Sequence, residues 1–446
     1  MRVIHWRERG FEEALKRLLL GFHEIPAEIR EGAEKIFDEV AAEGDAALFR
    51  WTEKLDRHQL TAKTVKVSTK EIAAAKKATP AADLAAMRVA ARRIRAYHKL
   101  QADKGFVFDD GKGTTIAEEV LPLQSAGLYV PAGRAPLAST ALMTGIPARL
   151  AGVPRIALCS PWPGGVMRAQ VLVAAELAGA GEVYKIGGAQ GIAALAAGTE
   201  SVPRVDKIVG PGNMWVNAAK AIAAARGLCA IDGLAGPSEI VVAADDSAPP
   251  EFVAWDLLSQ AEHGPDSSAC LVTTSLQLAQ AVQVQLFKLS AGHEGLNLAG
   301  VSAIVAPDLD RVAEFVDLIA PEHLEIITRD PERLAKKIRN AASIFLGPYS
   351  PVPAGDYLAG GNHVLPTGGA ARFASPLSVR DFQKRRSVTR LSEKAMRSIA
   401  QQVECFAGFE GLWAHGQSAR ARLQPAGETS KPRPAGASRP RSRKGK

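Results

Sequence analysis

The sequence predicts an α/β protein with two Rossmann-like, doubly wound domains that face a cleft, a helical N-terminal segment and a small C-terminal helical arm. The chain has 446 residues, which is too long for one compact core. Two separate series of short apolar runs alternate with helical patterns, which is typical of parallel sheets wrapped by helices. In such sheets, ligands bind outside the carboxyl ends of the strands.

The N-terminal region, up to about residue 120, is predicted to be mostly helical. Apolar residues recur there at intervals of three and four, which places them on one face of a helix. The helical stretches are 11–19, 28–55, 70–78 and 82–101.

The first α/β series follows from about residue 125. Its strand candidates mostly end in Gly or Pro, and they are 125–133, 155–161, 182–188, 205–212 and 228–232. Helical patterns at 165–181 and 213–226 separate some of these strands.

The second α/β series follows Gly236-Pro237. Its strand candidates are 238–246, 269–275, 301–308, 324–330 and 342–348, and its helical patterns are 249–263, 276–289, 309–320 and 331–341. Asp308 and Asp330 supply suitable helix starts. Residues 351–382 are rich in Gly and Pro and too long for a passive connector, and a last helix is predicted at 393–423.

The net charge of +8 does not indicate a nucleic-acid-binding protein. Residues 425–446 hold seven Lys or Arg against Glu428, so this segment carries +6 and the rest of the chain only +2. We therefore expect no nucleic-acid partner. The composition of the tail predicts a disordered, solvated segment, with weak contact to RNA or anionic surfaces as the alternative.

Membrane insertion, export and disulfide chemistry are also not expected. No apolar run is long enough to span a bilayer, and the N-terminus lacks the apolar core of a signal peptide, so a cytoplasmic protein is expected. The cysteines form no CxxC pair, which predicts reduced, buried thiols. They are Cys159, Cys229, Cys270 and Cys405.

Two glycine-rich turns are candidate phosphate contacts. The fingerprint GxGxxG is absent, but Gly187–Gly191 and Gly210–Asn213 each follow a predicted strand and precede a helix. Backbone can approach a phosphate closely at such turns, and a helix N-terminus favours an anion. Tight packing of the turn is the alternative for either stretch alone.

Several polar side chains are candidates for metal binding or proton transfer. Gln260 and His263 are three residues apart and project from one helix face, whereas Asp356 lies in the Gly/Pro-rich loop and His415 near the end of the last helix. Each alone is typical of an ordinary structural residue, and Gln is a rare zinc ligand. Glu322 and His323 precede a predicted strand, where they form either a general base with a water-orienting carboxylate or an exposed turn.

Together these stretches resemble one family, over residues 1 to about 424. The motifs occur here in the order found in histidinol dehydrogenases, and they are long enough to be specific. They are GLYVPAG, GGAQGIAALAAGT, DKIVGPGN, AGPSEIVV, DLLSQAEHGPD, APEHLEI, IFLGPYSPVPAGDYLAGGNHVLPT and EGLWAH.

The resemblance implies a zinc- and NAD-dependent enzyme that oxidises L-histidinol through an aldehyde to histidine, as a homodimer with a shared active site. It implies His323 as general base and Glu322 as the residue that activates water. The implied zinc ligands are Gln260, His263, Asp356 and, from the partner subunit, His415. The implied NAD contacts are Tyr129, Gln190 and Asn213. The implied substrate contacts are Ser238, Glu410 and His323, together with the four zinc ligands.

The resemblance also implies a division of the chain. Residues 25–115 and 238–375 are expected to form the domain with the metal and substrate site, and 116–237 the NAD-binding domain. Residues 1–24 would be an N-terminal arm, 376–424 a helical dimerisation arm and 425–446 a disordered tail.

The sequence departs from the family pattern at a few positions near the cofactor side and the metal site. Ala132 stands where Gly is usual, Arg134 and Pro136 where small or hydroxyl residues are common, and Gly264 where an acidic residue often follows. Related family members that oxidise sulfonated diols differ in the substrate-binding carboxylate and the terminal His. Because Glu410 and His415 are both present, histidinol is the preferred substrate, and another small alcohol is the alternative.

Overall fold

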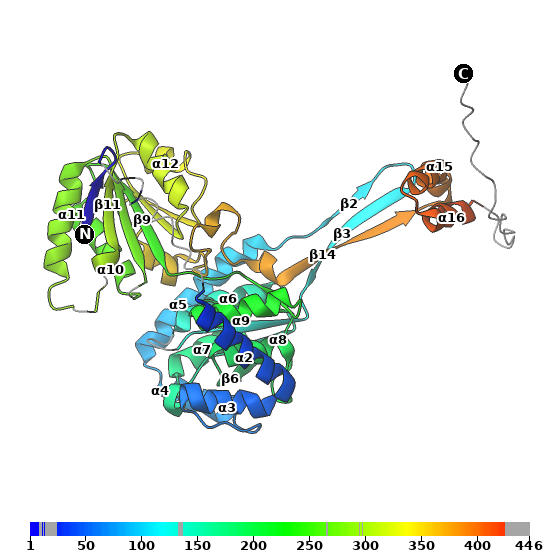
Figure 1. The fold of residues 1–446 in the computed structure, drawn as a ribbon, viewed down its shortest axis with the longest axis horizontal. Coiled ribbons are helices and arrows are strands. Elements are labelled where there is room, and N and C mark those ends of the chain that lie inside the picture. The colour runs from blue at the N-terminus through cyan, green and yellow to red at the C-terminus, as the bar shows by residue number, and fades with distance from the viewer. Residues whose placement is uncertain are drawn as a thin grey trace, which may run out of the picture. The chain divides into compact units, whose positions relative to one another are not determined.

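The computed structural model groups the chain into two compact units, each of which is described separately (Figure 1). Unit 1 comprises Met1–Asp103 and Pro122–Lys384, and unit 2 comprises Lys104–Leu121 and the chain from Arg385 onward. The residues that the structure describes are 1–8, 11, 13, 25–132, 137–264, 266–293, 295–296 and 298–423. The tail 425–446 and most of the predicted helix at 11–19 lie outside these residues.

The first α/β series forms a five-stranded parallel sheet in unit 1. The strand order is β6-β5-β4-β7-β8, so the order reverses between β4 and β7. The strands are β4 Ser125–Tyr129, β5 Arg155–Cys159, β6 Glu182–Tyr184, β7 Lys207–Val209 and β8 Ala230–Ile231. The helices of this series are α6 Ala138–Leu150, η2 Pro163–Gly165, α7 Ala169–Ala178, α8 Gly188–Ala197 and α9 Met214–Ala225.

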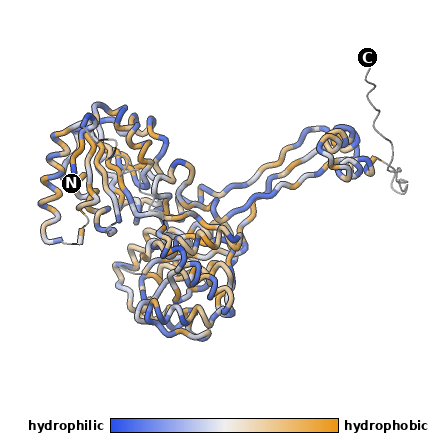
Figure 2. The backbone as a smooth tube through the Cα atoms, in the orientation of Figure 1, coloured by the Kyte–Doolittle hydropathy of each residue, from blue (hydrophilic) through white to orange (hydrophobic). Residues whose placement is uncertain are grey.

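The second series forms a six-stranded parallel sheet in the order β1-β11-β10-β9-β12-β13. Its strands are β9 Glu239–Ala244, β10 Ser268–Thr273, β11 Val301–Val305, β12 His323–Ile327, β13 Ser343–Leu346 and, at the edge, β1 Arg2–His5. Its helices are α10 Pro250–Ala261, α11 Leu276–Leu289, η3 Leu298–Gly300, α12 Leu309–Ile319 and α13 Pro331–Ala335. Figure 2 shows hydrophobic residues along the strands of the parallel sheets.

Both sheets confirm the predicted fold class, because sequential strands β4 to β8 and β9 to β13 follow the same Rossmann-like order. The predicted helix starts are also confirmed. Asp308 accepts a hydrogen bond from Arg311 N and caps α12, and Asp330 accepts one from Arg333 N and caps α13. Strand β1 was not predicted; its four residues gain strand structure only by pairing with β11.

The N-terminal helices pack against the five-stranded sheet and its helices. They are α2 Ala27–Glu43, α3 Asp45–Asp56, α4 Thr69–Ala78, α5 Ala81–His98 and the short η1 Lys99–Gln101. Phe37 of α2 shares a core with Ile192 of α8, and Ile94 of α5 shares one with Met143 of α6. This packing differs from the predicted grouping of 25–115 with 238–375, since an amphipathic pattern does not specify which sheet it covers. The domain boundaries themselves stay predictions.

The connection after β13 contains only short helical turns. They are α14 Val352–Ala354, the π-helical turn η4 Gly355–Ala359, η5 Ala370–Arg372 and η6 Val379–Phe382. This segment lies against the body of unit 1 rather than in solvent, because Asn362 donates to Met143 O and Gly368 N donates to the Glu239 carboxylate. The sequence prediction of a long, functional loop is consistent with this anchoring.

Unit 2 contains a three-stranded sheet and two helices. Strand β2 Phe106–Asp109 pairs antiparallel with β3 Thr114–Pro122, and β14 Gln383–Leu391 flanks β3. Helices α15 Glu393–Phe409 and α16 Trp413–Ala421 follow.

Two predictions for this region are wrong. The region up to about residue 120 was expected to be mostly helical and 376–424 to be a helical arm, but β2, β3 and β14 are strands. Pairing with neighbouring strands and cross-strand ion pairs such as Arg386 with Glu119 hold them extended. The predicted last helix at 393–423 is two helices, since Gly411 adopts a φ of 74° that ends the first one. His415 is therefore in the first turn of α16 and not near the end of a long helix.

The described part of the chain contains no helix that is long and apolar enough to cross a membrane. The cysteines are free thiols, as predicted. Cys159 and Cys270 are buried, but Cys229 is partly exposed and Cys405 is exposed, so the prediction of four buried thiols is only half right.

Candidate active site

A cavity of about 1540 Å³ in unit 1 is lined by residues from both parallel sheets. Tyr129 ends β4 and Asp232 follows β8, so the five-stranded sheet presents the carboxyl ends of its strands. Ser238, Ser267 and Glu322 immediately precede β9, β10 and β12, so the six-stranded sheet presents amino ends. The predicted cleft is confirmed. Only the wall formed by the five-stranded sheet consists of carboxyl ends of strands, where ligands were expected to lie.

The three predicted NAD contacts all line this cavity on the side of the five-stranded sheet. Tyr129 accepts a hydrogen bond from Gly188 N through its hydroxyl, at 3.2 Å. Gln190 is buried, and within the described part of the chain its Oε1 has no hydrogen-bond partner. Asn213 caps α9, because its Oδ1 accepts hydrogen bonds from Trp215 N and Val216 N at 3.1 Å each. The N-termini of α8 and α9 therefore open next to the cavity.

Each glycine turn begins at a position that leaves no room for a side chain. Gly210 has a φ of +119°, and a Cβ atom there would lie 2.2 Å from the carbonyl oxygen of Tyr129. A Cβ at Gly187 would lie 2.5 Å from Pro161. The same turns also face the cavity, because Gly188 and Gly212 line it.

His323 lies between two carboxylates at the amino end of β12. Its Nδ1 is 3.2 Å from the carbonyl oxygen of Glu239 and 3.5 Å from Glu322 Oε2, and its Nε2 is 3.5 Å from Asp356 Oδ1. The Glu239 carbonyl only accepts, so Nδ1 donates to it. In the neutral ring Nε2 is then the nitrogen free to accept a proton.

The two carboxylates control the protonation of His323. Burial lowers the pKa of this imidazole, but Glu322 and Asp356 outweigh burial and raise the pKa to about 10. Burial likewise raises the pKa of Asp356, yet His323 and further histidines lower it overall. Glu322 and Asp356 thus favour the protonated form of His323.

Gln260 and His263 lie at the end of α10, as predicted, although His263 is two residues past the last helical residue. Gln260 is buried, and its Nε2 has no hydrogen-bond partner among the residues that the structure describes. His263 lines the cavity, and its Nδ1 is 3.1 Å from the carbonyl oxygen of Ser259, which leaves Nε2 for a ligand. His263 also lowers the pKa of Asp356, so the two side chains are neighbours.

The described residues do not by themselves form a complete metal site. No group of three His, Cys, Asp or Glu side chains in the described ranges is arranged to hold a metal ion. Of the predicted ligands, only His263 and Asp356 are of these types and belong to unit 1. His415 and the predicted substrate contact Glu410 are exposed residues of unit 2.

The histidinol dehydrogenase family model matches residues 23–423 of this chain. The chain is 45% identical to the histidinol dehydrogenase of Cereibacter sphaeroides over 423 residues, which cover 94% of this chain and 97% of that protein. It is 43% identical to that of Syntrophotalea carbinolica over 430 residues, 95% of this chain and 99% of the relative. The crystal structure of histidinol dehydrogenase from Elizabethkingia anophelis matches with a TM-score of 0.88 and 37% identity, covering 95% of this chain and 98% of that chain.

The chain belongs to the histidinol dehydrogenase family. The resemblance to this family that the motifs indicated is confirmed, and so is the prediction of an NAD-dependent dehydrogenase. The roles of the individual site residues stay predictions. The structure shows where these residues lie in this member of the histidinol dehydrogenase family.

Sequence reasoning missed several buried polar residues at this histidinol dehydrogenase site. Glu239 begins β9, its backbone N–H donates to Glu322 Oε2 at 3.0 Å, and burial beside Glu322 raises its pKa to about 7. Glu325 of β12 accepts from Val352 N at 2.6 Å, and burial raises its pKa to about 9. Each is the one carboxylate in a mostly apolar strand, a signal that could have found it.

His363 is a further missed residue of the cavity wall. Its Nδ1 is 2.9 Å from the carbonyl oxygen of Asp356, and burial lowers its pKa. It follows Asp356 by seven residues in the Gly/Pro-rich segment, where no periodic pattern indicates which side chains turn inward.

Two of the four departures from the family pattern are described by the structure. Ala132 is buried and lines the cavity near Tyr129. Gly264 lines the cavity after His263 and has a φ of 145°, a conformation that L side chains rarely adopt. An acidic residue at this position would therefore strain the backbone. Arg134 and Pro136 lie outside the described residues.

Proposed function

We propose that this enzyme catalyses the oxidation of L-histidinol through L-histidinal to L-histidine, a four-electron reaction with two NAD⁺ that ends histidine biosynthesis. Membership of the family over nearly the whole chain carries the proposal. The cavity supports it, because both glycine turns, His263 and Glu322 line one space, and His323 lies against Glu322.

NAD⁺, which accepts a hydride in each step, is proposed to bind at the carboxyl ends of the five-stranded sheet. Tyr129, Gln190 and Asn213 line that wall. The N-termini of α8 and α9 begin in the same two turns, and helix N-termini favour the anionic pyrophosphate of a dinucleotide.

His323 is proposed to remove the alcohol proton. The Glu239 carbonyl holds Nδ1, so Nε2 is the base and points toward Asp356. A base needs a pKa near the working pH, whereas Glu322 and Asp356 raise the pKa of His323 above its usual value. The proposal therefore requires that positive charge at Asp356 lower the pKa of His323.

A divalent cation fits that requirement. Gln260, His263 and Asp356 are proposed to hold one zinc ion, with His415 of a second copy as the fourth ligand. The free Nε2 of His263 and the Asp356 carboxylate are ligand types that zinc accepts, and Gln260 would bind through its amide oxygen. The negative end of the α10 dipole also favours a cation there. Zinc would supply a template for the substrate's amine and imidazole, and some polarisation of its oxygen.

Glu322 is proposed to activate the water that hydrates the aldehyde before the second oxidation. Its carboxylate lines the cavity next to His323 and is oriented by the hydrogen bond from Glu239 N. An enclosed site also retains the reactive aldehyde between the two steps.

We propose a homodimer with a shared active site, to which unit 2 contributes Glu410 and His415. Unit 2 exposes large apolar side chains that a partner is expected to cover. They include Phe106 at 62%, Val107 at 71%, Phe406 at 61%, Phe409 at 68% and Trp413 at 76% exposure. Ser238, which lines the cavity beside Glu322, is proposed to contact the substrate together with Glu410.

An assay of NAD⁺ reduction tests the function. We expect turnover with L-histidinol and none with sulfonated diols; the reverse result would assign the chain to the related dehydrogenases that act on such diols. Metal analysis of the same preparation tests the cofactor, and one zinc per subunit is expected. A scaffold or nucleic-acid role of the basic tail predicts no turnover of either alcohol.

A further inference from the structure

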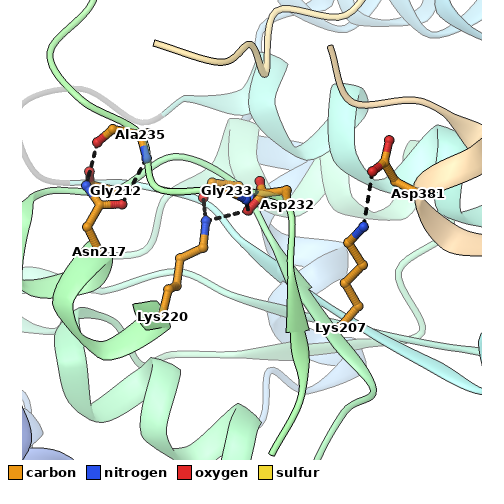
Figure 3. Close-up of polar contacts among 9 residues, drawn as sticks. Lys207, Gly212, Asn217, Lys220, Asp232, Gly233, Ala235 and Asp381 are labelled. Atoms are coloured by element: carbon orange, nitrogen blue, oxygen red, sulfur yellow. Dashed lines mark hydrogen bonds and ion pairs between the residues drawn. The ribbon is translucent and has the colours of Figure 1, made fainter. Parts of the chain in front are cut away.

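A buried lysine of α9 holds the glycine turn at the cofactor wall (Figure 3). The side chain of Lys220 is 1% exposed, and its Nζ donates to the carbonyl oxygen of Gly210 at 3.1 Å and to Asp232 Oδ1 at 2.5 Å. Asp232 Oδ2 in turn accepts from Gly210 N at 2.7 Å. Both backbone groups of Gly210 are therefore occupied by one ion pair.

Asn217, three residues before Lys220 on α9, makes a second set of contacts (Figure 3). Its Nδ2 donates to the carbonyl oxygens of Gly212 at 3.3 Å and Ala235 at 2.5 Å, and its Oδ1 accepts from Ala235 N at 3.2 Å. One helix face thus holds the turn 210–213 and the segment 232–238 together.

These two segments lead to opposite walls of the cavity. The turn presses against Tyr129, since a Cβ on Gly210 would meet the Tyr129 carbonyl, and it ends at Asn213. The segment 232–238 carries the chain from β8 to Ser238 and the start of β9, and Gly236 N donates to Thr367 Oγ1. A shift of the turn relative to this segment would change the space between the walls.

Stability alone does not account for a buried ion pair of this kind. Removing two charges from water costs about as much as their attraction returns, and an apolar pair of similar volume is often as stable. The ion pair also fixes the orientation of the backbone around it. Its four hydrogen bonds hold the peptide groups of Gly210 and the N–H of Gly233 in place.

We infer that Lys220, Asp232 and Asn217, the α9 network, are positioning residues that set the affinity for NAD⁺ by fixing the 210–213 turn. The inference rests on the proposed function, because that function places NAD⁺ at this turn. None of the three is a catalytic residue, so the chemical step at saturating NAD⁺ is expected to be unaffected.

The test compares four variants of the full chain in two measurements, the Kd for NAD⁺ alone by calorimetry and the kinetic constants with histidinol. Lys220→Met removes the cation and leaves a buried, uncompensated Asp232. Lys220→Met combined with Asp232→Leu removes both charges. Asn217→Ala cuts the second set of contacts without leaving a charge. Lys207→Met is the control, since Lys207 forms a similar ion pair with Asp381 at 3.1 Å on the same sheet but contacts neither segment.

We expect Lys220→Met to raise the Kd and the KM for NAD⁺ by about tenfold or more, because the charge-assisted hydrogen bond to the Gly210 carbonyl and the ion pair with Asp232 are both lost. The kcat and the KM for histidinol at saturating NAD⁺ should stay within about twofold. The double variant should regain most of the lost melting temperature but not the NAD⁺ affinity. Asn217→Ala should raise the Kd in the same direction, and Lys207→Met should leave it unchanged.

Recovery of NAD⁺ affinity in the double variant would overturn the inference, since the ion pair would then act only through stability. An increase in Kd for Lys207→Met equal to that for Lys220→Met would overturn it as well. If Lys220→Met does not fold, an unchanged Kd in Asn217→Ala overturns it. Failure of the proposed function is separate: it appears as wild-type protein that binds NAD⁺ but does not oxidise histidinol.

Discussion

The two parallel sheets of unit 1 share one strand order but contribute opposite edges to the cavity. The five-stranded sheet presents carboxyl ends, with glycine turns and helix N-termini, whereas the six-stranded sheet presents amino ends, with Ser238, Ser267 and Glu322. In a parallel α/β layer the helices start at the carboxyl edge and finish at the amino edge. The two walls of the cavity therefore have helix dipoles of opposite sign.

This difference explains where each ligand is proposed to bind. Helix N-termini carry partial positive charge and suit the phosphates of NAD⁺. The C-terminal end of α10 carries partial negative charge and, with Asp356 and Glu322, suits a cation and an amine. The carboxyl edge of one sheet and the amino edge of the other both line the cavity. Two sheets with the same strand order therefore supply both electrostatic environments.

The largest expected effect comes from removing the cation site of the amino edge. His263→Ala should lose bound zinc and nearly all activity, on the order of a thousandfold or more, because an imidazole ligand is lost. Metal content by mass spectrometry and turnover with histidinol are the measurements. His293→Ala, at an exposed histidine of the same sheet's domain, is the control. A His263→Ala protein that keeps one tightly bound zinc per subunit would contradict the ligand assignment.

The next effect separates the two oxidation steps. Glu322→Gln should slow the oxidation of histidinal by about a hundredfold, since an amide cannot accept a proton from the attacking water. Rapid kinetics with histidinal as the substrate measures this step alone. Glu332→Gln, at an exposed position on α13, should leave the rate unchanged. An unaltered aldehyde step in Glu322→Gln would remove Glu322 from the mechanism.

The third prediction concerns the carboxyl edge. Gly210→Ala should destabilise the fold by about 1–3 kcal/mol and weaken NAD⁺ binding, because its φ of +119° suits only glycine and the new Cβ meets the Tyr129 carbonyl. Gly227→Ala is the matched control, since it also has a positive φ, +66°, but faces open space. Denaturation and calorimetry measure both. Equal losses of NAD⁺ affinity in the two variants would show that the close approach to Tyr129 is unimportant.

The fourth prediction tests how the Gly/Pro-rich segment is anchored to the N-terminal helices. Asn362 Nδ2 lies 3.0 Å from His98 Nε2, and burial lowers the pKa of His98 to about 4 from its usual 6.5. The unfolded chain binds this proton first, so the stabilising contribution is complete above pH 6.5 and is lost as the pH falls toward 4. The loss should not exceed about 2 kcal/mol.

Urea unfolding at pH 7 and pH 5 measures this dependence. His98→Gln should show a smaller decrease in unfolding free energy between the two pH values than the wild type, because it cannot titrate. His293→Gln should retain the wild-type decrease. A His98→Gln protein with an unchanged pH dependence would show that other groups cause it.

The smallest effect is expected for the basic tail. Deleting residues 425–446 should leave the turnover of histidinol nearly unchanged, because the segment lies outside the family match. Steady-state kinetics of the shortened protein is the measurement, and abolished activity would favour a role through the tail.

Much of the second sheet was predictable because its strands are continuous apolar runs between capped helices. All five predicted strands from 238 to 348 are present, and Asp308 and Asp330 cap the helices that follow. Local physics decides these elements. Unit 2 was not predictable in this way, since the nine residues of β14, QKRRSVTRL, have no apolar alternation and take their conformation from the neighbouring β3.

The candidate site was predictable only through recognition of motifs. Gln260 and His263 share a helix end by spacing, but no local pattern connects them with Asp356, almost a hundred residues later. Glu239, Glu325 and His363 were missed because their roles come from burial beside other charges. Burial of this kind is a property of the folded chain.

By itself the sequence determined the alternation of strands and helices, the glycine turns and the family, because these depend on periodicity, backbone freedom and motifs that are local in the chain. Only the tertiary structure decided which edge of each sheet faces the cavity, and that the N-terminal helices cover the five-stranded sheet. It also placed a buried ion pair behind the cofactor turn. These features arise from contacts between segments distant in sequence, whose energies depend on packing and desolvation and not on any one segment's composition.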